Sequence, residues 1–273
     1  MESITESITE HIMSRISNKV DFHSHIIPGV DDGSRSFEMT SSMLETSKSE
    51  GVKYIAATSH FILGEVEYSR ADYDLRLKNV QENIEEINVV PGMEVYINPE
   101  LKKLYKEKRI WTINNSRYML IELPMNDFPV YTEEVFYELR LEGVVPILAH
   151  PERNRAIIKN EALLESLIEQ GAMAQMNVGS LTGAFGKTIK EFAERLVKRN
   201  LIQIIGSDAH NDRHRTTSVN EGRHIIEKIN PDLFEWIEDN EEKIILNEEI
   251  QCLNICNYKE KKFFDFFKRK ERR

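Results

Sequence analysis

The 273-residue chain has few cysteines, and its two cysteines lie close together near the C-terminal end. Cys252 and Cys256 are separated by three residues, which is outside the C-x-x-C spacing of redox motifs, so a structural disulfide is not expected. If this stretch is helical, the two thiols share a face, and we expect them to be small buried hydrophobes.

The sequence also lacks an apolar run at its start and an excess of positive charge. Residues 1–18 are polar and carry Glu2, Glu6 and Glu10, so neither a signal peptide nor a transmembrane segment is expected there, and we expect a cytoplasmic protein. The chain has 36 Lys and Arg against 46 Asp and Glu, and its formal net charge of −10 argues against nucleic-acid binding. The remaining composition, 40% hydrophobic and 30% charged, is that of an ordinary soluble globular protein.

Seven apolar runs separated by longer charged segments predict alternating strands and helices. The runs are nearly continuous in hydrophobicity, which is typical of parallel strands buried on both faces. Gly51, Gly143 and Gly171 each stand where a helix would close before the next strand. We therefore predict one α/β barrel domain over residues 19–258, with about seven βα repeats and no dividing linker. The expected strands are 19–23, 53–58, 89–94, 118–122, 144–149, 173–177 and 202–207, and helices are expected at 71–87, 132–142, 159–170 and 186–199.

His23 and His25 directly follow the first of these runs. Alternate positions of a strand point to the same face, so the two imidazoles are expected to converge. Such a pair is the first half of a metal site, because neutral imidazole binds Zn, Mn and Fe alike. By itself the pair is equally consistent with two surface histidines in a turn.

Further histidines and carboxylates end the other expected strands. Because a parallel barrel gathers the C-terminal ends of its strands on one rim, these side chains are expected to meet there. Five imidazoles and at least four carboxylates exceed what one ion can hold, so two or three metals fit better. Carboxylates packed this closely would repel one another unless cations were present. The candidate ligands are His23, His25, Asp32, His60, Glu94, Glu122, His150, Asp208 and His210.

Arginines near two of these strand ends favour a phosphorylated substrate. Arg153 follows His150 in the same loop, and Arg213 and Arg215 follow His210. Guanidinium groups bind phosphate oxygens in a bidentate manner, and paired metals roughly 3.5–4 Å apart suit the hydrolysis of phosphate esters. The alternative is that these arginines pair with nearby surface acids.

Seven short motifs, in order along residues 19–250, carry a resemblance to a known family. They are His23-Ser24-His25, Val30-Asp31-Asp32-Gly33, Thr58-Ser59-His60, Pro91-Gly92-Met93-Glu94, Ile121-Glu122-Leu123-Pro124, Ala149-His150-Pro151-Glu152-Arg153 and Ser207-Asp208-Ala209-His210. Together they resemble the polymerase and histidinol phosphatase (PHP) superfamily. Within it, the chain is most similar to the bacterial manganese-dependent protein-tyrosine phosphatases of capsule and exopolysaccharide clusters, the CpsB/YwqE/CapC group.

This resemblance implies a distorted (β/α)7 TIM-like barrel, the PHP fold, that holds three divalent metal ions. Mn²⁺ is the expected ion, with Fe and Zn as alternatives. The implied ligand sets are His23, His25, Glu94 and Asp208 for the first ion, Glu94, Glu122 and His150 for the second, and Asp32, His60 and His210 for the third. Asp31 is the alternative to Asp32 in the loop that follows the first strand.

The resemblance further implies hydrolysis of phosphotyrosine on a membrane-associated bacterial tyrosine kinase of capsule or exopolysaccharide synthesis. Arg153 and Arg215 look like the phosphate-binding pair, and Asp208 or His60 would protonate the leaving group if any residue does. The two cysteines lie outside any Cys-x5-Arg loop, so no phosphocysteine is expected. Two alternatives keep the fold: a phosphatase of a small phosphomonoester such as histidinol phosphate, and a non-catalytic regulatory barrel.

The two ends of the chain add expectations of their own. Residues 1–18 form an extension before the first motif, and because an N-terminal segment can mediate ring assembly in this family, the oligomeric state stays open. Residues 259–273 carry eight basic and three acidic side chains together with four phenylalanines. This composition predicts either a segment that contacts a membrane surface or a final helix packed on the barrel.

Overall fold

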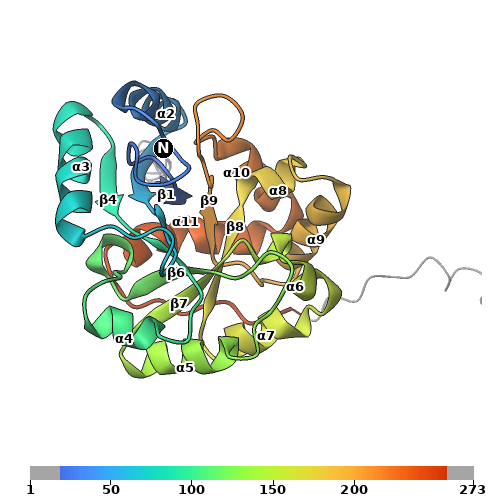
Figure 1. Ribbon diagram of the computed structural model, residues 1–273. Coiled ribbons are helices and arrows are strands. Elements are labelled where there is room, and N and C mark those ends of the chain that lie inside the picture. The colour runs from blue at the N-terminus through green and yellow to red at the C-terminus, as the bar shows by residue number, and fades with distance from the viewer. Residues whose placement is uncertain (1–18, 257–273) are drawn as a thin grey trace, which may run out of the picture.

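The computed structural model describes residues 19–256, so the predictions for the N-terminal extension and for the tail at 259–273 lie outside the described residues. Parallel strands form the centre of the molecule and helices surround them (Figure 1). The strands are β1 (Lys19–Ser24), β2 (Val52–Ala57), β3 (His60–Phe61), β4 (Asn88–Pro91), β5 (Glu94–Tyr96), β6 (Tyr118–Glu122), β7 (Val145–Ala149), β8 (Met173–Asn177) and β9 (Ile204–Gly206).

These strands fill the seven positions of a distorted (β/α)7 barrel. β2 and β3 follow one another in one position, and β4 and β5 in the next, because the two pairs keep one register: Ala57 lies opposite Pro91, and His60 lies opposite Glu94. Strands β5 to β9 then pair in chain order, all parallel. The predicted fold class is thereby confirmed.

The third expected strand is interrupted between β4 and β5, and the second is followed by the separate short strand β3; the sequence predicted neither feature. The Tyr73 hydroxyl donates to the Ala57 carbonyl oxygen and accepts from the Gly92 backbone N–H at 3.3 Å. The indole of Trp111 donates to the Gly92 carbonyl oxygen at 3.0 Å. Since side chains satisfy the buried backbone groups at the break, the ladder does not have to continue through it.

A β-bulge in β1 re-aims the first histidine of the predicted pair. Three steps of β1, from Asp21 to Ser24, lie opposite two steps of β2. The extra residue shifts the alternation of side chains. Phe22 can therefore belong to the apolar cluster inside the barrel while His23, the next residue, reaches the polar cluster described below.

The barrel closes where β9 meets β1. The backbone N–H of Asp208 donates to the His23 carbonyl oxygen at 2.8 Å, and the N–H of His25 donates to the Ala209 carbonyl oxygen at 2.8 Å. Gly206 permits this close approach, because a Cβ there would lie 2.5 Å from the Cβ of His23. The first and last strands therefore hold their histidines and Asp208 against one another.

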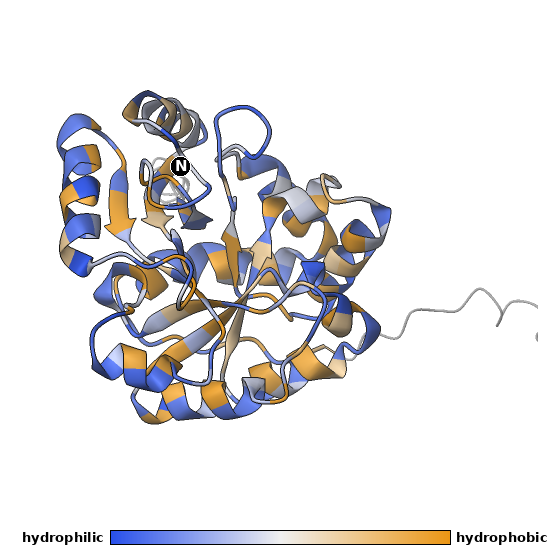
Figure 2. Ribbon diagram, viewed as in Figure 1, coloured by the Kyte–Doolittle hydropathy of each residue, from blue (hydrophilic) through white to orange (hydrophobic). Residues whose placement is uncertain are grey.

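Helices cover the outside of the barrel and alternate hydrophobic with hydrophilic residues, whereas the strands are mostly hydrophobic (Figure 2). One core lies between strands and helices, and a smaller one that includes Phe22, Leu120 and Ile147 fills the barrel interior. The helices are α2 (Phe37–Ser49), α3 (Arg70–Asn83), α4 (Leu101–Lys106), α5 (Thr132–Leu141), α6 (Arg155–Lys159), α7 (Ala162–Glu169), α8 (Val178–Thr182), α9 (Lys187–Lys198), α10 (Asn220–Ile229) and α11 (Pro231–Ile245), with short 3-10 turns η1 (Ile113–Asn115) and η2 (Pro151–Arg153).

Most predicted helices are found, with changes at their ends. The expected helix at 159–170 is α7, and the separate short helix α6 before it was not predicted. The three glycines proposed to close helices, Gly51, Gly143 and Gly171, all have positive φ. Within residues 19–256, no helix combines the length and the apolar character needed to cross a membrane.

The expectation of buried cysteines is wrong. Residues 250–256 form no helix, and both Cys252 and Cys256 are exposed. The backbone N–H of Cys256 instead donates to the Arg199 carbonyl oxygen at 2.9 Å, which leads the chain along the surface after α11 ends.

Candidate metal centre

All nine candidate ligands meet at the C-terminal ends of the strands, and each has a nitrogen or carboxylate oxygen within 4 Å of another. Most are buried, and Asp32 is the exposed member, with 68% of its side chain accessible. They come from loops and strand ends that are far apart in the sequence, as a parallel barrel predicts. Side chains that end strands far apart in the sequence therefore lie in one cluster.

The His-x-His pair lies at the bottom of the cluster. The Nε2 atoms of His23 and His25 are 3.1 Å apart, so the two imidazoles converge as predicted. Glu94 Oε2 lies 3.2 Å from His23 Nε2 and 3.4 Å from His25 Nε2. Asp208 Oδ1 lies 3.6 and 3.5 Å from the same two nitrogens. Two nitrogens and two carboxylate oxygens thus face one point.

Glu94 joins this group to a second one. Its Oε1 lies 3.0 Å from His150 Nε2, and Glu122 Oε1 lies 3.7 Å from the same nitrogen. The other oxygen of Glu122 is 3.7 Å from His60 Nδ1, which is itself 2.9 Å from Glu94 Oε2. Glu94 therefore contacts both neighbouring groups and is the natural bridging carboxylate.

The third group surrounds Asp32 in the loop after β1. Asp32 Oδ1 lies 3.4 Å from His210 Nε2 and 3.7 Å from His60 Nε2. His25 also lies within reach of this group. His60 and His25 each belong to two groups of neighbouring donor atoms. The ligand sets implied by the resemblance assign each of them to one ion, so the observed groups overlap more than those sets do.

The choice between Asp31 and Asp32 has a geometric answer. Asp31 Oδ2 accepts from His25 Nδ1 at 2.8 Å and from the backbone N–H of His60 at 2.8 Å, whereas Asp32 faces the ring nitrogens of His60 and His210. An imidazole that donates through Nδ1 presents its Nε2 lone pair to a metal. Asp31 therefore holds the ring of His25 and the backbone of His60, and Asp32 is the one of the two whose carboxylate faces ring nitrogens across the cluster.

Strand β8 supplies positioning residues that sequence reasoning missed. His23 Nδ1 lies 2.9 Å from Gln175 Oε1, and the amide of Gln175 donates to Asn177 Oδ1 at 2.9 Å. The amide of Asn177 donates to Asp208 Oδ2 at 2.6 Å. The available signal was two amides at alternate positions of an otherwise apolar strand, which places both on the interior face.

A buried carboxylate anchors the loop that carries Arg153. Glu152 accepts from the backbone N–H of Asn177 at 3.0 Å and from the Ser180 hydroxyl at 2.6 Å. This ties η2 to the end of β8. Glu152 was seen only as part of a motif, because a glutamate beside a candidate site looks in sequence like a surface acid.

Backbone strain accompanies two of the candidate ligands. His150 has φ 32° and Asp208 has φ 53°, and neither residue is the glycine that this left-handed region favours. Such strain costs of order 1–3 kcal/mol and collects at functional sites. The fold therefore holds both side chains in conformations that local preference would not choose.

Without bound cations, burial and neighbouring charges shift the pKa values of the clustered imidazoles and carboxylates in different directions. Burial opposes charge on His25, but the charge of the Asp31 carboxylate and the hydrogen bonds that Asp208 and Asp31 accept from His25 raise the pKa of His25 well above its usual range. Burial would likewise raise the pKa of Glu94, but the charges of His23 and His60 hold it well below its usual range. Protons on the imidazoles thus balance the carboxylates here.

The pKa of the Glu122 carboxylate shifts in the opposite direction from that of Glu94. Burial and the charge of Glu94 raise the pKa of Glu122. His60 Nδ1 is buried, and among residues 19–256 it makes no hydrogen bond despite its short distance to Glu94. Convergent imidazole and carboxylate atoms with an unsatisfied ring nitrogen fit divalent cations, which accept both ligand types.

Both candidate arginines border the same cluster. Arg153 Nη1 lies 2.8 Å and Arg215 Nη2 lies 2.6 Å from Asp208 Oδ2. The Arg215 loop folds back, since the backbone N–H of His210 donates to the Arg215 carbonyl oxygen at 2.9 Å. Arg213 is exposed and is placed in no contact with the cluster in the described part of the chain.

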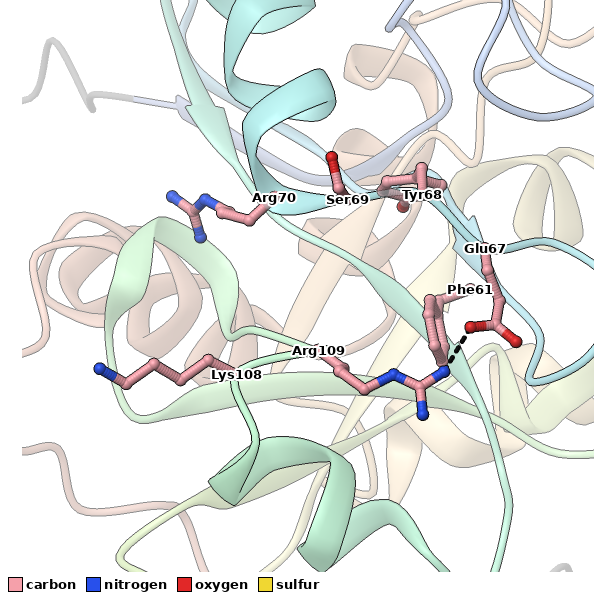
Figure 3. A pocket seen from close by; sticks show the side chains of 7 residues that line it. All are labelled: Phe61, Glu67, Tyr68, Ser69, Arg70, Lys108 and Arg109. Carbon is pink, nitrogen blue, oxygen red and sulfur yellow. Dashed lines mark hydrogen bonds and ion pairs between the residues drawn. The ribbon is translucent and has the colours of Figure 1, made fainter.

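Two pockets are lined by residues other than the candidate ligands. The first has a volume of about 430 Å³, and in Figure 3 Arg109 reaches across it to the Glu67 carboxylate. No candidate ligand lines it, so it is not the reacting centre. Its lining residues are Phe61, Glu67, Tyr68, Ser69, Arg70, Lys108 and Arg109. The second pocket, which includes Arg153, is described further below.

A buried set of imidazoles and carboxylates bordered by arginines, on the C-terminal rim of a parallel barrel, has the make-up of a metal-dependent hydrolase site. The sequence matches the family described as capsular polysaccharide synthesis, CpsB/CapC, over residues 19–246. The chain belongs to this family.

The chain is similar in sequence and in structure to a tyrosine-protein phosphatase over most of its length. Tyrosine-protein phosphatase YwqE of Bacillus subtilis is 35% identical over 254 residues, which cover 91% of this chain and 100% of the relative. A crystal structure of YwqE, described together with CpsB of Streptococcus pneumoniae as unique metal-dependent tyrosine phosphatases, superposes with a TM-score of 0.81 and covers 88% of this chain and 100% of that one. A histidinol phosphate phosphatase of Lactococcus lactis is similar in fold alone, at 13% identity, a TM-score of 0.51 and coverage of 78% of this chain and 94% of that one.

Proposed function

We propose that this protein is a metal-dependent protein-tyrosine phosphatase. The observation that carries the proposal is the single cluster in which nine imidazoles and carboxylates meet two arginines at Asp208. A chain of the CpsB/CapC family with this cluster has both a place for cations and a place for phosphate. Metal-dependent hydrolysis needs no cysteine nucleophile, and neither Cys252 nor Cys256 belongs to the cluster.

The cluster would hold three divalent ions, with Mn²⁺ as the expected metal. Each ion would have at least three imidazole or carboxylate ligands, and Glu94 would serve two of the sets. The sets are His23, His25, Glu94 and Asp208, then Glu94, Glu122 and His150, then Asp32, His60 and His210. The groups of donor atoms that lie within 4.8 Å of one another support the third set and three members of the first, His23, His25 and Asp208. They place Glu94 with His23 and His150 in one group and with His60 and Glu122 in another, so the second set is drawn from two overlapping groups. When bound, the ions supply Lewis-acid charge at the phosphoryl oxygens and activate water for attack on phosphorus.

Arg153 and Arg215 bind the phosphate of the substrate. Their guanidinium groups both reach Asp208, so they lie at the edge of the cluster where a phosphoryl group would enter. Arg215 Nε is buried and has no hydrogen-bond partner among residues 19–256. A phosphate oxygen would supply that partner, and the planar guanidinium suits two oxygens at once.

The leaving group needs little help from a proton donor. A tyrosinate has a conjugate acid with a pKa of about 10, far lower than that of an alkyl alcohol. Burial would raise the pKa of Asp208, but the charge of His23 and its other cationic neighbours hold it well below its usual range, so Asp208 is a carboxylate at neutral pH. His60, the other predicted proton donor, is assigned here to the third ion, so we assign no dedicated proton donor for the tyrosinate.

The substrate is a phosphotyrosine protein, and a membrane-associated bacterial tyrosine kinase of capsule or exopolysaccharide synthesis fits the family. The exposed side chain of Asp32 and the partly exposed side chain of Arg215 make this edge of the cluster accessible to a phosphotyrosine on a peptide segment. We place the protein in the cytoplasm, where such a kinase would present its phosphorylated segment. Assembly through residues 1–18 and membrane contact through residues 259–273 stay predictions.

Replacing the His-x-His pair tests the site. His23→Ala with His25→Ala should abolish hydrolysis of a phosphotyrosine peptide in the presence of Mn²⁺ and lower the number of ions bound, while circular dichroism stays near that of the parent. The matched control replaces the exposed His214 and His224, which contact no candidate ligand, and should keep activity. Full activity of a folded His23/His25 variant would refute the proposed site.

A further inference from the structure

A second pocket adjoins the metal centre and shares Arg153 with it. It has a volume of about 320 Å³ and lies between η2 and α6 on one side and the start of α9 on the other. Its lining residues are Arg153, Arg155, Ile158, Lys159, Phe185, Gly186, Lys187, Thr188 and Ile189. A substrate segment that enters the centre past Arg153 would therefore meet this pocket next.

The pocket has an apolar floor. The Arg153 guanidinium lies over the ring of Phe185, 4.3 Å from its centroid, and Ile158 and Ile189 line the same space. A cation over an aromatic face is attracted to it, which limits the orientations open to Arg153. The floor thus both shapes the pocket and orients an arginine assigned to phosphate.

The rim of the pocket is cationic. Arg153, Arg155, Lys159 and Lys187 line it and no acidic residue does. Within residues 19–256, Arg155 and Lys159 lie within 4 Å of no carboxylate, whereas Lys187 lies 3.6 Å from the exposed Glu191. In a chain with a formal net charge of −10, such a group of cations favours an anionic partner.

We infer that this pocket binds an acidic side chain that flanks the phosphotyrosine of the substrate. This inference rests on the proposed function. A glutamate or aspartate combines a short apolar stem with a carboxylate, which matches an apolar floor below a cationic rim. The pocket and the phosphate site share Arg153, so one extended peptide can reach both. The protein therefore selects substrates with acidic residues beside phosphotyrosine.

Two peptides and two variants test this inference. The peptides share a central phosphotyrosine and carry either glutamate or glutamine at the positions on both sides of it. The variants are Lys159→Glu in the pocket and Lys108→Glu in the pocket of Figure 3, which make the same change of charge at exposed lysines. Initial rates with Mn²⁺ give kcat and KM for each pair, with free phosphotyrosine as a third substrate.

The parent should hydrolyse the glutamate peptide with a KM about tenfold lower than the glutamine peptide, at similar kcat. Lys159→Glu should remove that preference and leave free phosphotyrosine unaffected, whereas Lys108→Glu should keep it. Equal loss in both lysine variants would mean general electrostatic attraction, and loss of free phosphotyrosine hydrolysis in Lys159→Glu would mean that the pocket holds the phosphotyrosine ring. Either result overturns the inference.

The inference and the proposed function fail in different ways. If the parent hydrolyses free phosphotyrosine and both peptides with the same KM, the pocket does not select acidic residues although the protein is a tyrosine phosphatase. If the parent hydrolyses none of the three substrates with Mn²⁺, the proposed function itself is wrong.

Discussion

Individual side chains in the centre are oriented by partners that are not themselves candidate ligands. Asp31 holds His25, and Gln175 holds His23, in each case through Nδ1. Such outer partners fix the tautomer and direction of an imidazole and so strengthen metal binding. The sequence showed the ligands because histidine at a strand end is conspicuous. Asp31 and Gln175 were harder to assign because their roles depend on contacts made across the barrel.

The raised pKa values of the imidazoles predict that metal binding depends on pH. Nearby carboxylates raise the pKa of both His23 and His25 in the metal-free protein, so protons occupy these rings at a pH where free histidine is neutral. A metal needs the neutral ring, so binding must displace those protons. The apparent affinity for Mn²⁺ should therefore rise with pH, by about tenfold per pH unit for each proton displaced.

Titration calorimetry between pH 6 and pH 8, in buffers of different ionisation enthalpy, measures both the affinity and the protons released. The control protein His23→Ala with His25→Ala should show weaker binding and a smaller pH slope. An affinity that is the same at pH 6 and pH 8, with no protons released, would contradict this reading of the cluster.

At the scale of elements, the junction of β9 with β1 sets the geometry of the site. It brings the His-x-His pair of β1 beside Asp208, and the bulge in β1 turns His23 inward. The seven strand positions could be predicted because long apolar runs and closing glycines are local signals. The bulge and the breaks at Ala57 and Gly92 could not, since they depend on Tyr73, Trp111 and other partners from distant elements.

Gly206→Ala tests how closely the two strands must approach. An added Cβ would lie 2.5 Å from the His23 Cβ and 2.8 Å from Gln175 Nε2, so β9 would have to move away from β1. Overpacking of this kind typically costs about 1–3 kcal/mol. Both the free energy of unfolding in denaturant and the affinity for Mn²⁺ should fall.

Gly64→Ala is the matched control for this change. Gly64 has φ 84° and nothing lies within 4 Å of a Cβ built there, so alanine meets only the backbone cost of the left-handed region, about 1 kcal/mol. It should leave metal affinity unchanged. If Gly206→Ala loses no more stability than Gly64→Ala and binds Mn²⁺ as the parent does, the close approach is not essential.

For the whole molecule, the barrel brings scattered motifs together in one cluster at the C-terminal ends of its strands. Charged residues are likewise separated by location. Buried acids and imidazoles form the centre, and exposed cations line the pocket beside Arg153. Strand-end motifs and the barrel rule together could predict which residues meet. They could not predict how the ligand groups overlap at His60 and Glu94, because that depends on distances that only the closed barrel sets.

The most direct test of the account compares two phosphomonoesters before and after metal removal. The protein is treated with a chelator, assayed on a phosphotyrosine peptide and on histidinol phosphate, and assayed again after Mn²⁺ is restored. We expect no turnover without metal, recovery with Mn²⁺, and a clear preference in kcat/KM for the phosphotyrosine peptide. Full turnover by the chelated protein, or a preference for histidinol phosphate, would contradict the account.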